Sequence, residues 1–240
     1  MRWVAEAMRA ATRRRMRWWG MLAVVCLLPA CASAPRYTTR TVAKPRTSGV
    51  WPRREVLDLA MRAYQCGRAQ GEFSQPLLTV IDYSLPSTAR RLWVIDIARR
   101  RVLFNELVAH GANSGDTYAF AFSNRVGSRQ SSIGVFRTDE TYYGRHGRSL
   151  RLSGLEPGVN DKARERAIVI HAAEYVSDQT VSTYGRLGRS WGCPALPEGV
   201  NDRIIDRIQG GTAVFAYYPD RDWLQSSRFI NCNLRVAQNG

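Results

Sequence analysis

The chain has 240 residues and carries 35 Lys and Arg against 20 Asp and Glu, a formal net charge of +15, and 45% of its residues are hydrophobic. That hydrophobic fraction excludes a mainly disordered chain, and five cysteines are too few for a small disulfide-stapled scaffold. The length predicts one folded domain with a small appendage. The positive charge points first to nucleic acid, a reading that depends on where the charge lies along the chain.

Residues 1–30 predict a lipoprotein signal peptide. They hold six arginines and one glutamate, a net +5 that leaves +10 for residues 31–240, and an apolar run from Met21 to Leu28 follows the arginines. This run is shorter than the about 20 residues of a membrane-spanning helix and has the length of a secretory signal core. Translation starting at Met16 would leave a shorter signal, and the sequence does not decide between the two starts.

The segment Leu28-Pro29-Ala30-Cys31 resembles the lipobox of bacterial lipoproteins. The resemblance implies that Cys31 carries lipid and anchors the mature chain at the periplasmic face of the envelope. Because no aspartate follows Cys31, the resemblance favours anchoring in the outer membrane over the inner one. The alternative is a plain secretory signal cut at Ala30, Ala32 or Ala34. Residues 31–50 are rich in Thr, Ser, Pro, Lys and Arg and predict a flexible tether.

The mature chain predicts a mainly β domain. A helix is expected within residues 51–76, beginning near Pro52, and a C-terminal tail over 221–240. Between them, residues 77–220 form the predicted catalytic domain, a sandwich or barrel-like β fold with short helices. The predicted strands are Leu77–Tyr83, Arg91–Ile97, Val102–His110, Ile133–Phe136, Leu150–Leu152, Ala167–His171 and Thr212–Tyr218, and Asn201–Gln209 is a predicted helix.

One histidine and one cysteine point to chemistry. His171 ends a hydrophobic strand, and Cys193 follows 22 residues later in the glycine-rich segment 185–196. A thiol beside an imidazole suits nucleophilic catalysis, because the imidazole takes the thiol proton and the thiolate attacks a carbonyl. Backbone N–H groups of Trp191, Gly192 and Cys193 would then face the developing oxyanion. By itself the pair is weak evidence, since single cysteines and histidines are often structural.

A wider pattern resembles a known family. Ser190-Trp191-Gly192-Cys193 is similar to the S-x-G-C signature of the YkuD-type L,D-transpeptidases, in which a catalytic His precedes the Cys, as His171 does here. The branch resembled has G-R-S-W-G-C-P-A after an I-H-x-A-x-Y-V-S stretch. Further matching segments, among them 110–115, 122–124, 131–134, 143–150 and 158–161, spread the resemblance over roughly Leu77 to Pro219.

The chain departs from the better-known branch at two places beside the cysteine. Trp191 stands where that branch has His, and Pro194-Ala195 stand where it has an Arg shortly after the Cys. The first departure leaves His171 as the only nearby histidine. The second leaves open how a substrate carboxylate is bound, with Arg186 and Arg189 as candidates or as solvated loop residues.

The other candidate substrate contacts are Ser190 and the residues of segment 142–146, which are Tyr142, Tyr143 and His146. His110 is expected to be structural. The three histidines are too widely spaced for a familiar zinc motif, so no metal and no cofactor is expected.

The resemblance implies that the substrate is a peptidoglycan stem peptide and that Cys193 forms a thioester while D-Ala leaves. The acceptor stays open: a second stem peptide, a lipoprotein lysine, a D-amino acid, or water, which would make the enzyme a hydrolase. The resemblance also implies that carbapenems acylate Cys193. Other readings are a cysteine hydrolase acting as an L,D-carboxypeptidase or on wall–lipoprotein links, a non-catalytic peptidoglycan-binding lipoprotein and a nucleic-acid-binding one, although an envelope location argues against nucleic acid. The protein is expected to be a monomer.

The remaining cysteines sort by position. Cys26 lies in the signal, which leaves Cys66 and Cys232, one near each end of the mature domain. In an oxidising periplasm these two are expected either to form a disulfide or to remain two buried thiols.

Overall fold

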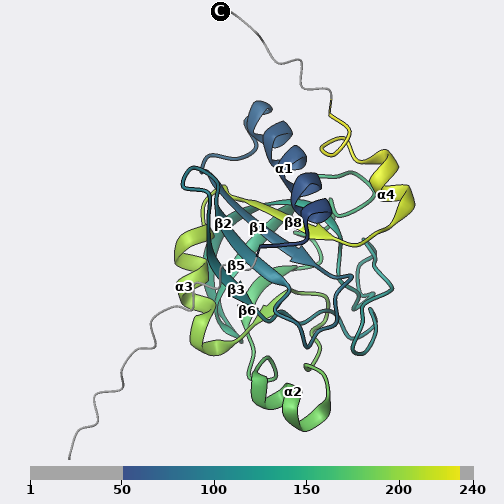
Figure 1. Ribbon diagram of the computed structural model, residues 1–240. Coiled ribbons are helices and arrows are strands. Elements are labelled where there is room, and N and C mark those ends of the chain that lie inside the picture. Colours follow the sequence, from purple (N-terminus) through teal and green to yellow (C-terminus); the bar gives the residue numbers. More distant parts are fainter. Residues whose placement is uncertain (1–50, 233–240) are drawn as a thin grey trace, which may run out of the picture. The chain divides into compact units, whose positions relative to one another are not determined.

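The computed structural model describes residues 51–232. Eight strands form one mixed sheet in the order β3-β2-β1-β8-β4-β5-β6-β7 (Figure 1). The strands are β1 (Leu77–Asp82), β2 (Leu92–Asp96), β3 (Arg101–Glu106), β4 (Gly134–Gly144), β5 (Gly147–Gly154), β6 (Val169–Ala172), β7 (Ala195–Leu196) and β8 (Ala213–Tyr217). The helices are α1 (Arg54–Ala69), α2 (Asp178–Tyr184), α3 (Glu198–Ile208) and α4 (Arg221–Ser226).

The sheet is nearly closed on itself. Just beyond β3, Ala109 bridges to Ala195 of β7, and its N–H donates to the Ala195 carbonyl at 2.9 Å. The two outer strands of the sheet are thereby connected, which protects edges that would otherwise be open to pairing with another chain. The mainly β, barrel-like fold predicted from the sequence is confirmed.

Each face of the central strands is buried under helices. β1, β2 and β8 are buried along their whole length, so their sequences are hydrophobic runs with little alternation. On one face, Val80 and Phe215 pack with α1 and with Trp223 of α4, and on the other, Ile81 and Val214 pack with Ile204 of α3. In Figure 1, α1 and α4 lie together on one side of the sheet and α3 lies on another.

The predicted elements exist, with differences at their ends. The sequence predicts a strand over Val102–His110, but β3 ends at Glu106. Beyond it, Ala109 pairs with Ala195 and no longer with β2. The hairpin of β4 and β5 is much longer than the two short runs predicted. Its distal half, from Glu140 to Gly147, is half-buried or exposed and has no hydrophobic pattern to reveal it.

The chain end predicted as a tail contains a packed helix. α4 begins after Asp220, whose side chain accepts a hydrogen bond from the Trp223 N–H. Trp223 is buried, and its indole donates at 3.0 Å to Glu156, a buried carboxylate that also accepts from the Val135 N–H at 2.8 Å. This buried hydrogen-bond network fixes α4 to β4.

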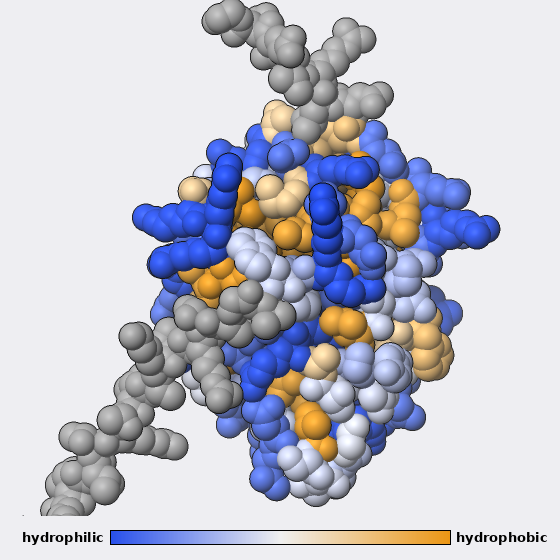
Figure 2. Space-filling view, in the orientation of Figure 1, coloured by the Kyte–Doolittle hydropathy of each residue, from blue (hydrophilic) through white to orange (hydrophobic). Residues whose placement is uncertain are grey.

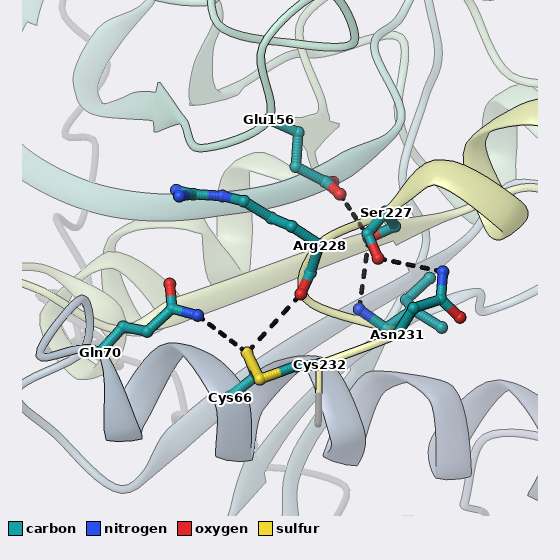
Figure 3. The surroundings of a disulfide bond; sticks show 8 residues. Cys66, Gln70, Glu156, Ser227, Arg228, Asn231 and Cys232 are labelled. Carbon is teal, nitrogen blue, oxygen red and sulfur yellow. Dashed lines mark hydrogen bonds between the residues drawn. A yellow bond between two sulfur atoms is a disulfide. The ribbon is translucent and has the colours of Figure 1, made fainter. Parts of the chain in front are cut away.

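Cys66 and Cys232 form a disulfide, with 6.1 Å between their Cα atoms (Figure 3). Cys66 lies on α1, so the bond joins this helix to the chain beyond α4. The Gln70 amide donates to the Cys66 sulfur at 3.1 Å. Of the two alternatives for these cysteines, the structure shows the disulfide.

The surface of the domain is strongly polar. Figure 2 shows hydrophilic side chains over much of one face, with smaller hydrophobic areas between them. No helix within residues 51–232 is long and apolar enough to cross a membrane. The predicted signal peptide, the tether and Cys31 lie outside the described residues.

Candidate active site

The pairing of β6 with β7 brings the two halves of the glycine-rich region together. The strands are parallel, and His171 lies opposite Ala195, two residues after Cys193. Both side chains line one cavity of about 600 Å³. The other residues lining it are Tyr142, Arg145, His146, Arg166, Ala167, Val169, Tyr175, Arg189, Ser190 and Trp191. Residues 22 positions apart in the sequence therefore meet in a space large enough for a peptide end.

His171 is held as a neutral base. Its Nδ1 lies 2.8 Å from the Ala172 carbonyl, and because a carbonyl only accepts, Nδ1 carries the hydrogen and Nε2 is free to accept a proton. Burial lowers the pKa of His171, the Ala172 bond raises it and the nearby His146 lowers it. The His146 ring stacks on His171 with 4.4 Å between centroids. His171 therefore stays unprotonated at neutral pH.

Cys193 is a thiol at rest. The residue is partly exposed and lines the cavity. Burial raises the pKa of the thiol, while the Val169 N–H and the Arg166 guanidinium lower it. Its hydrogen bond goes to the Ala167 carbonyl at 3.5 Å, and no hydrogen bond to His171 is present among the described residues. Such contacts are often long before substrate binds.

Ser190 holds the turn that carries Cys193. Its hydroxyl donates to the Cys193 carbonyl at 2.6 Å and accepts from the Gly192 N–H at 3.1 Å. The Gly192 N–H, expected at the oxyanion, is thus already occupied. Within residues 51–232, the N–H groups of Trp191 and Cys193 have no hydrogen-bond partner, which leaves those two for an oxyanion.

Gly192 is required by the shape of this turn. Its φ is +123°, and a Cβ there would lie 2.7 Å from the Gln130 carbonyl. Any L side chain would be strained and would collide with the neighbouring backbone. The glycine therefore lets the cysteine turn pack directly against segment 128–132.

The cavity is positively charged. Arg145, Arg166 and Arg189 line it together with two histidines, and no carboxylate side chain among the described residues does. Arg189 forms an ion pair with Asp116, which lies outside the lining. Arg186 is not part of the lining and donates to the Leu187 carbonyl. The charge suits a ligand that carries a carboxylate.

The remaining predicted contacts fall into two groups. Tyr142 and Trp191 line the cavity, each with an arginine over its ring: Arg151 at 4.3 Å and Arg129 at 4.6 Å. Trp191 is 70% exposed, so most of its surface is available to a ligand. Tyr143 is 82% exposed and does not line the cavity.

His110 supports the site from beneath. It is fully buried, its Nδ1 accepts from Arg91 at 2.8 Å, and its Nε2–H donates to the Gly115 carbonyl. Burial, followed by the charge of Arg91, lowers the pKa of His110 to about 4. Its backbone carbonyl accepts from the Ser190 N–H at 3.0 Å, so His110 is placed as a structural residue under the cysteine turn.

Sequence reasoning missed Arg166. Its guanidinium donates to the Ser132 hydroxyl at 2.5 Å, to the Gln130 carbonyl at 2.5 Å and to the Ser128 hydroxyl at 3.2 Å, and it also bonds to the Ser123 carbonyl. The one available signal was its place, directly before the hydrophobic strand that ends at His171.

A second cavity of about 520 Å³ adjoins the first, and Arg145, His146 and Tyr175 line both. It differs in charge, because three carboxylates, of Glu174, Glu198 and Asp202, line it together with two arginines, Arg145 and Arg148. Within the described part of the chain, none of the three forms an ion pair, and no cluster of His, Cys, Asp and Glu there is suited to hold a metal ion.

A family model described as the L,D-transpeptidase catalytic domain matches residues 51–217. No curated protein matches the chain. Similar solved structures include an L,D-transpeptidase from Mycobacterium smegmatis, at 14% identity and a TM-score of 0.37, with 60% of this chain and 59% of that one covered. Another is the helical cell shape determining protein Pgp2 from Campylobacter jejuni, at 13% identity and a TM-score of 0.39, with 66% of this chain and 54% of that one covered. The chain thus spans less than two thirds of the length of these two proteins.

Proposed function

Because the chain belongs to the L,D-transpeptidase catalytic domain family, we propose that it is a cysteine L,D-transpeptidase acting on peptidoglycan stem peptides. The observation that carries the proposal is the meeting of Cys193 and a neutral His171 in one basic cavity. The donor is a tetrapeptide stem whose terminal D-Ala is released.

In the first half of the proposed reaction, His171 Nε2 takes the proton of the Cys193 thiol, and the sulfur attacks the carbonyl of the diamino acid that precedes D-Ala. The carbonyl oxygen becomes an oxyanion facing the N–H groups of Cys193 and Trp191, donors that are typically worth a few kcal/mol in the transition state. His171 then returns the proton to the D-Ala nitrogen as the peptide bond breaks, which leaves a thioester.

In the second half, an acceptor amine attacks the thioester. His171 takes a proton from the amine, the new amide forms, and the thiol is regenerated with that proton. The carboxylates of the second cavity support an approach from that side, because the acceptor amine is an ammonium ion in water; it releases one proton to solvent before the neutral amine attacks. The arginines of the first cavity suit the carboxylate of the departing D-Ala.

We further propose that the mature protein is a lipoprotein anchored through Cys31 at the periplasmic face, on the outer membrane. The lipobox-like segment and the following tether support this location. Intact-mass analysis of the mature protein tests it: a diacylglyceryl-modified Cys31 is expected as the first residue, and an unmodified N-terminus at Cys31, Ser33 or Pro35 contradicts it.

The enzymatic proposal is tested with purified tetrapeptide muropeptides, with and without an added amine acceptor. The wild-type chain should release D-Ala and form a new amide bond, and a carbapenem should add its mass to Cys193. Cys193→Ala should do neither, and Cys193→Ser should lose most of the rate, because a hydroxyl is a far weaker nucleophile than a thiolate. Full turnover by either variant refutes the mechanism.

Release of D-Ala that yields only tripeptide, even with acceptor present, would identify a hydrolase. Retention of muropeptide with no turnover by the wild type would identify a binding protein.

A further inference from the structure

Arg166 is a half-buried charge without an acidic partner. Every hydrogen bond of its guanidinium within residues 51–232 goes to an uncharged oxygen, and all four acceptors lie between Ser123 and Ser132. Moving a charge out of water is costly unless another charge compensates it. The neutral acceptors take hydrogen bonds from both Nη atoms and leave the positive charge unneutralised.

The guanidinium lies directly against the cysteine turn. It lines the cavity with Cys193, and its Nη2 is 3.3 Å from where a Cβ of Gly192 would stand. The same nitrogen binds the Gln130 carbonyl, the oxygen against which Gly192 packs. The arginine, segment 123–132 and the cysteine turn therefore form one packed unit.

The other arginines of the cavity are placed differently. Arg189 is paired with Asp116, and Arg145 is exposed at the tip of the β4–β5 hairpin. Water and the paired carboxylate weaken the field of these two at the sulfur. Arg166 is the half-buried and unpaired member of the set.

We propose that Arg166 is a positioning residue that stabilises the thiolate of Cys193 by its charge. It exchanges no proton: the thiol proton moves to His171 Nε2, and Arg166 keeps all of its own. As the sulfur becomes negatively charged in the first step, the guanidinium of Arg166 already lies beside the cysteine turn. It stabilises the developing charge without having to move. The inference deepens the proposed function and rests on Cys193 being its nucleophile.

Titratable side chains surround the sulfur of Cys193 from several elements. Besides Arg166, they are His171 on β6; Tyr142, Arg145 and His146 on the β4–β5 hairpin; Tyr175 and Arg189 on the loops after β6; and Tyr83 after β1. Burial opposes ionisation of the thiol, and Arg166 is the charged side chain that lowers its pKa. Loss of this charge should therefore raise the pKa of Cys193.

The test is the pH dependence of Cys193 alkylation by iodoacetamide in the full chain, followed by peptide mass spectrometry so that other cysteines do not interfere. Arg166→Gln keeps hydrogen-bond donors and removes the charge, and we expect it to raise the thiol pKa by about 1–2 units. Arg166→Lys keeps the charge, and we expect a pKa within about 0.5 unit of the wild type. Arg125→Gln, an exposed arginine of the same segment outside the cavity, should change nothing.

Equal shifts in the Gln and Lys variants would overturn the proposal and make Arg166 a structural clamp for segment 123–132. An unchanged pKa in Arg166→Gln would overturn it as well. If Arg166→Gln does not fold, as judged by its thermal unfolding transition, the Lys variant decides, because a raised thiol pKa there contradicts the role of charge. Alkylation needs no muropeptide, so a failure of the proposed enzymatic activity is scored separately, by the absence of D-Ala release in the wild type.

Discussion

Replacing Ser190 by alanine should damage both stability and reactivity. Ser190 is 4% exposed, and its hydroxyl joins the Gly192 N–H to the Cys193 carbonyl across the turn. Each bond contributes about 1 kcal/mol, and the buried N–H left without a partner costs about 1–3 kcal/mol more. We therefore expect Ser190→Ala to lower the free energy of unfolding by about 3–5 kcal/mol. A turn displaced by an ångström would slow acylation of Cys193 about 10- to 100-fold.

Urea unfolding monitored by tryptophan fluorescence measures the first effect, and the rate of carbapenem adduct formation measures the second at a temperature where the variant is folded. Ser226→Ala is the matched control. It loses a hydroxyl bond of similar length, 2.7 Å to the Asp222 carbonyl, at the surface of α4. The control should stay within about 0.5 kcal/mol of the wild type. A Ser190→Ala variant that also stays within that range, with an unchanged acylation rate, would refute the view that this hydroxyl holds the turn.

Two further predictions concern stability. Because the pKa of His110 falls from 6.5 to about 4 on folding, the unfolded chain binds a proton first as the pH drops, and the wild type should lose about 3 kcal/mol between pH 6.5 and pH 4 through this residue. Urea unfolding of His110→Gln beside the wild type should show a stability difference that shrinks with falling pH, and a constant difference contradicts the assignment. Replacing Cys66 and Cys232 together by serine should cost 2–5 kcal/mol, because the bond closes a loop over a sequence separation of 166. Equal unfolding midpoints with and without reductant would disprove that contribution.

The parts of the fold that follow from sequence are those whose burial is continuous. β1, β2 and β8 are buried on both faces, so hydrophobic runs mark them clearly. The distal hairpin of β4 and β5 is held by cross-strand pairing between exposed or half-buried residues, and it leaves no such mark. The two-residue strand β7 depends wholly on its partners, His171 and Ala109, which lie far away in the sequence.

The candidate site shows the same division. Cys193 and His171 carry chemistry in their residue types, so a pattern of residues can single them out. The state of the Gly192 N–H and the place of Arg166 cannot be read that way, since both depend on contacts with segment 123–132 and with Ser190. The carbonyl that orients His171 belongs to its own neighbour, Ala172, and any residue type would supply it.

The two cavities give the excess of positive charge a specific meaning. A net charge of +15 over the whole sequence describes neither of them: three arginines and no carboxylate line the cavity around Cys193, whereas three carboxylates and two arginines line its neighbour. In the proposed reaction, the first cavity is matched to the free carboxylate of the departing D-Ala, and the second to an acceptor that arrives as an ammonium ion and releases one proton to solvent before it attacks. His146 and Tyr175 line both cavities, and the His146 ring stacks on His171. His171, the base of the proposed mechanism, thus lies where both substrates can reach it. The mechanism requires this, because His171 takes a proton first from the thiol and later from the amine.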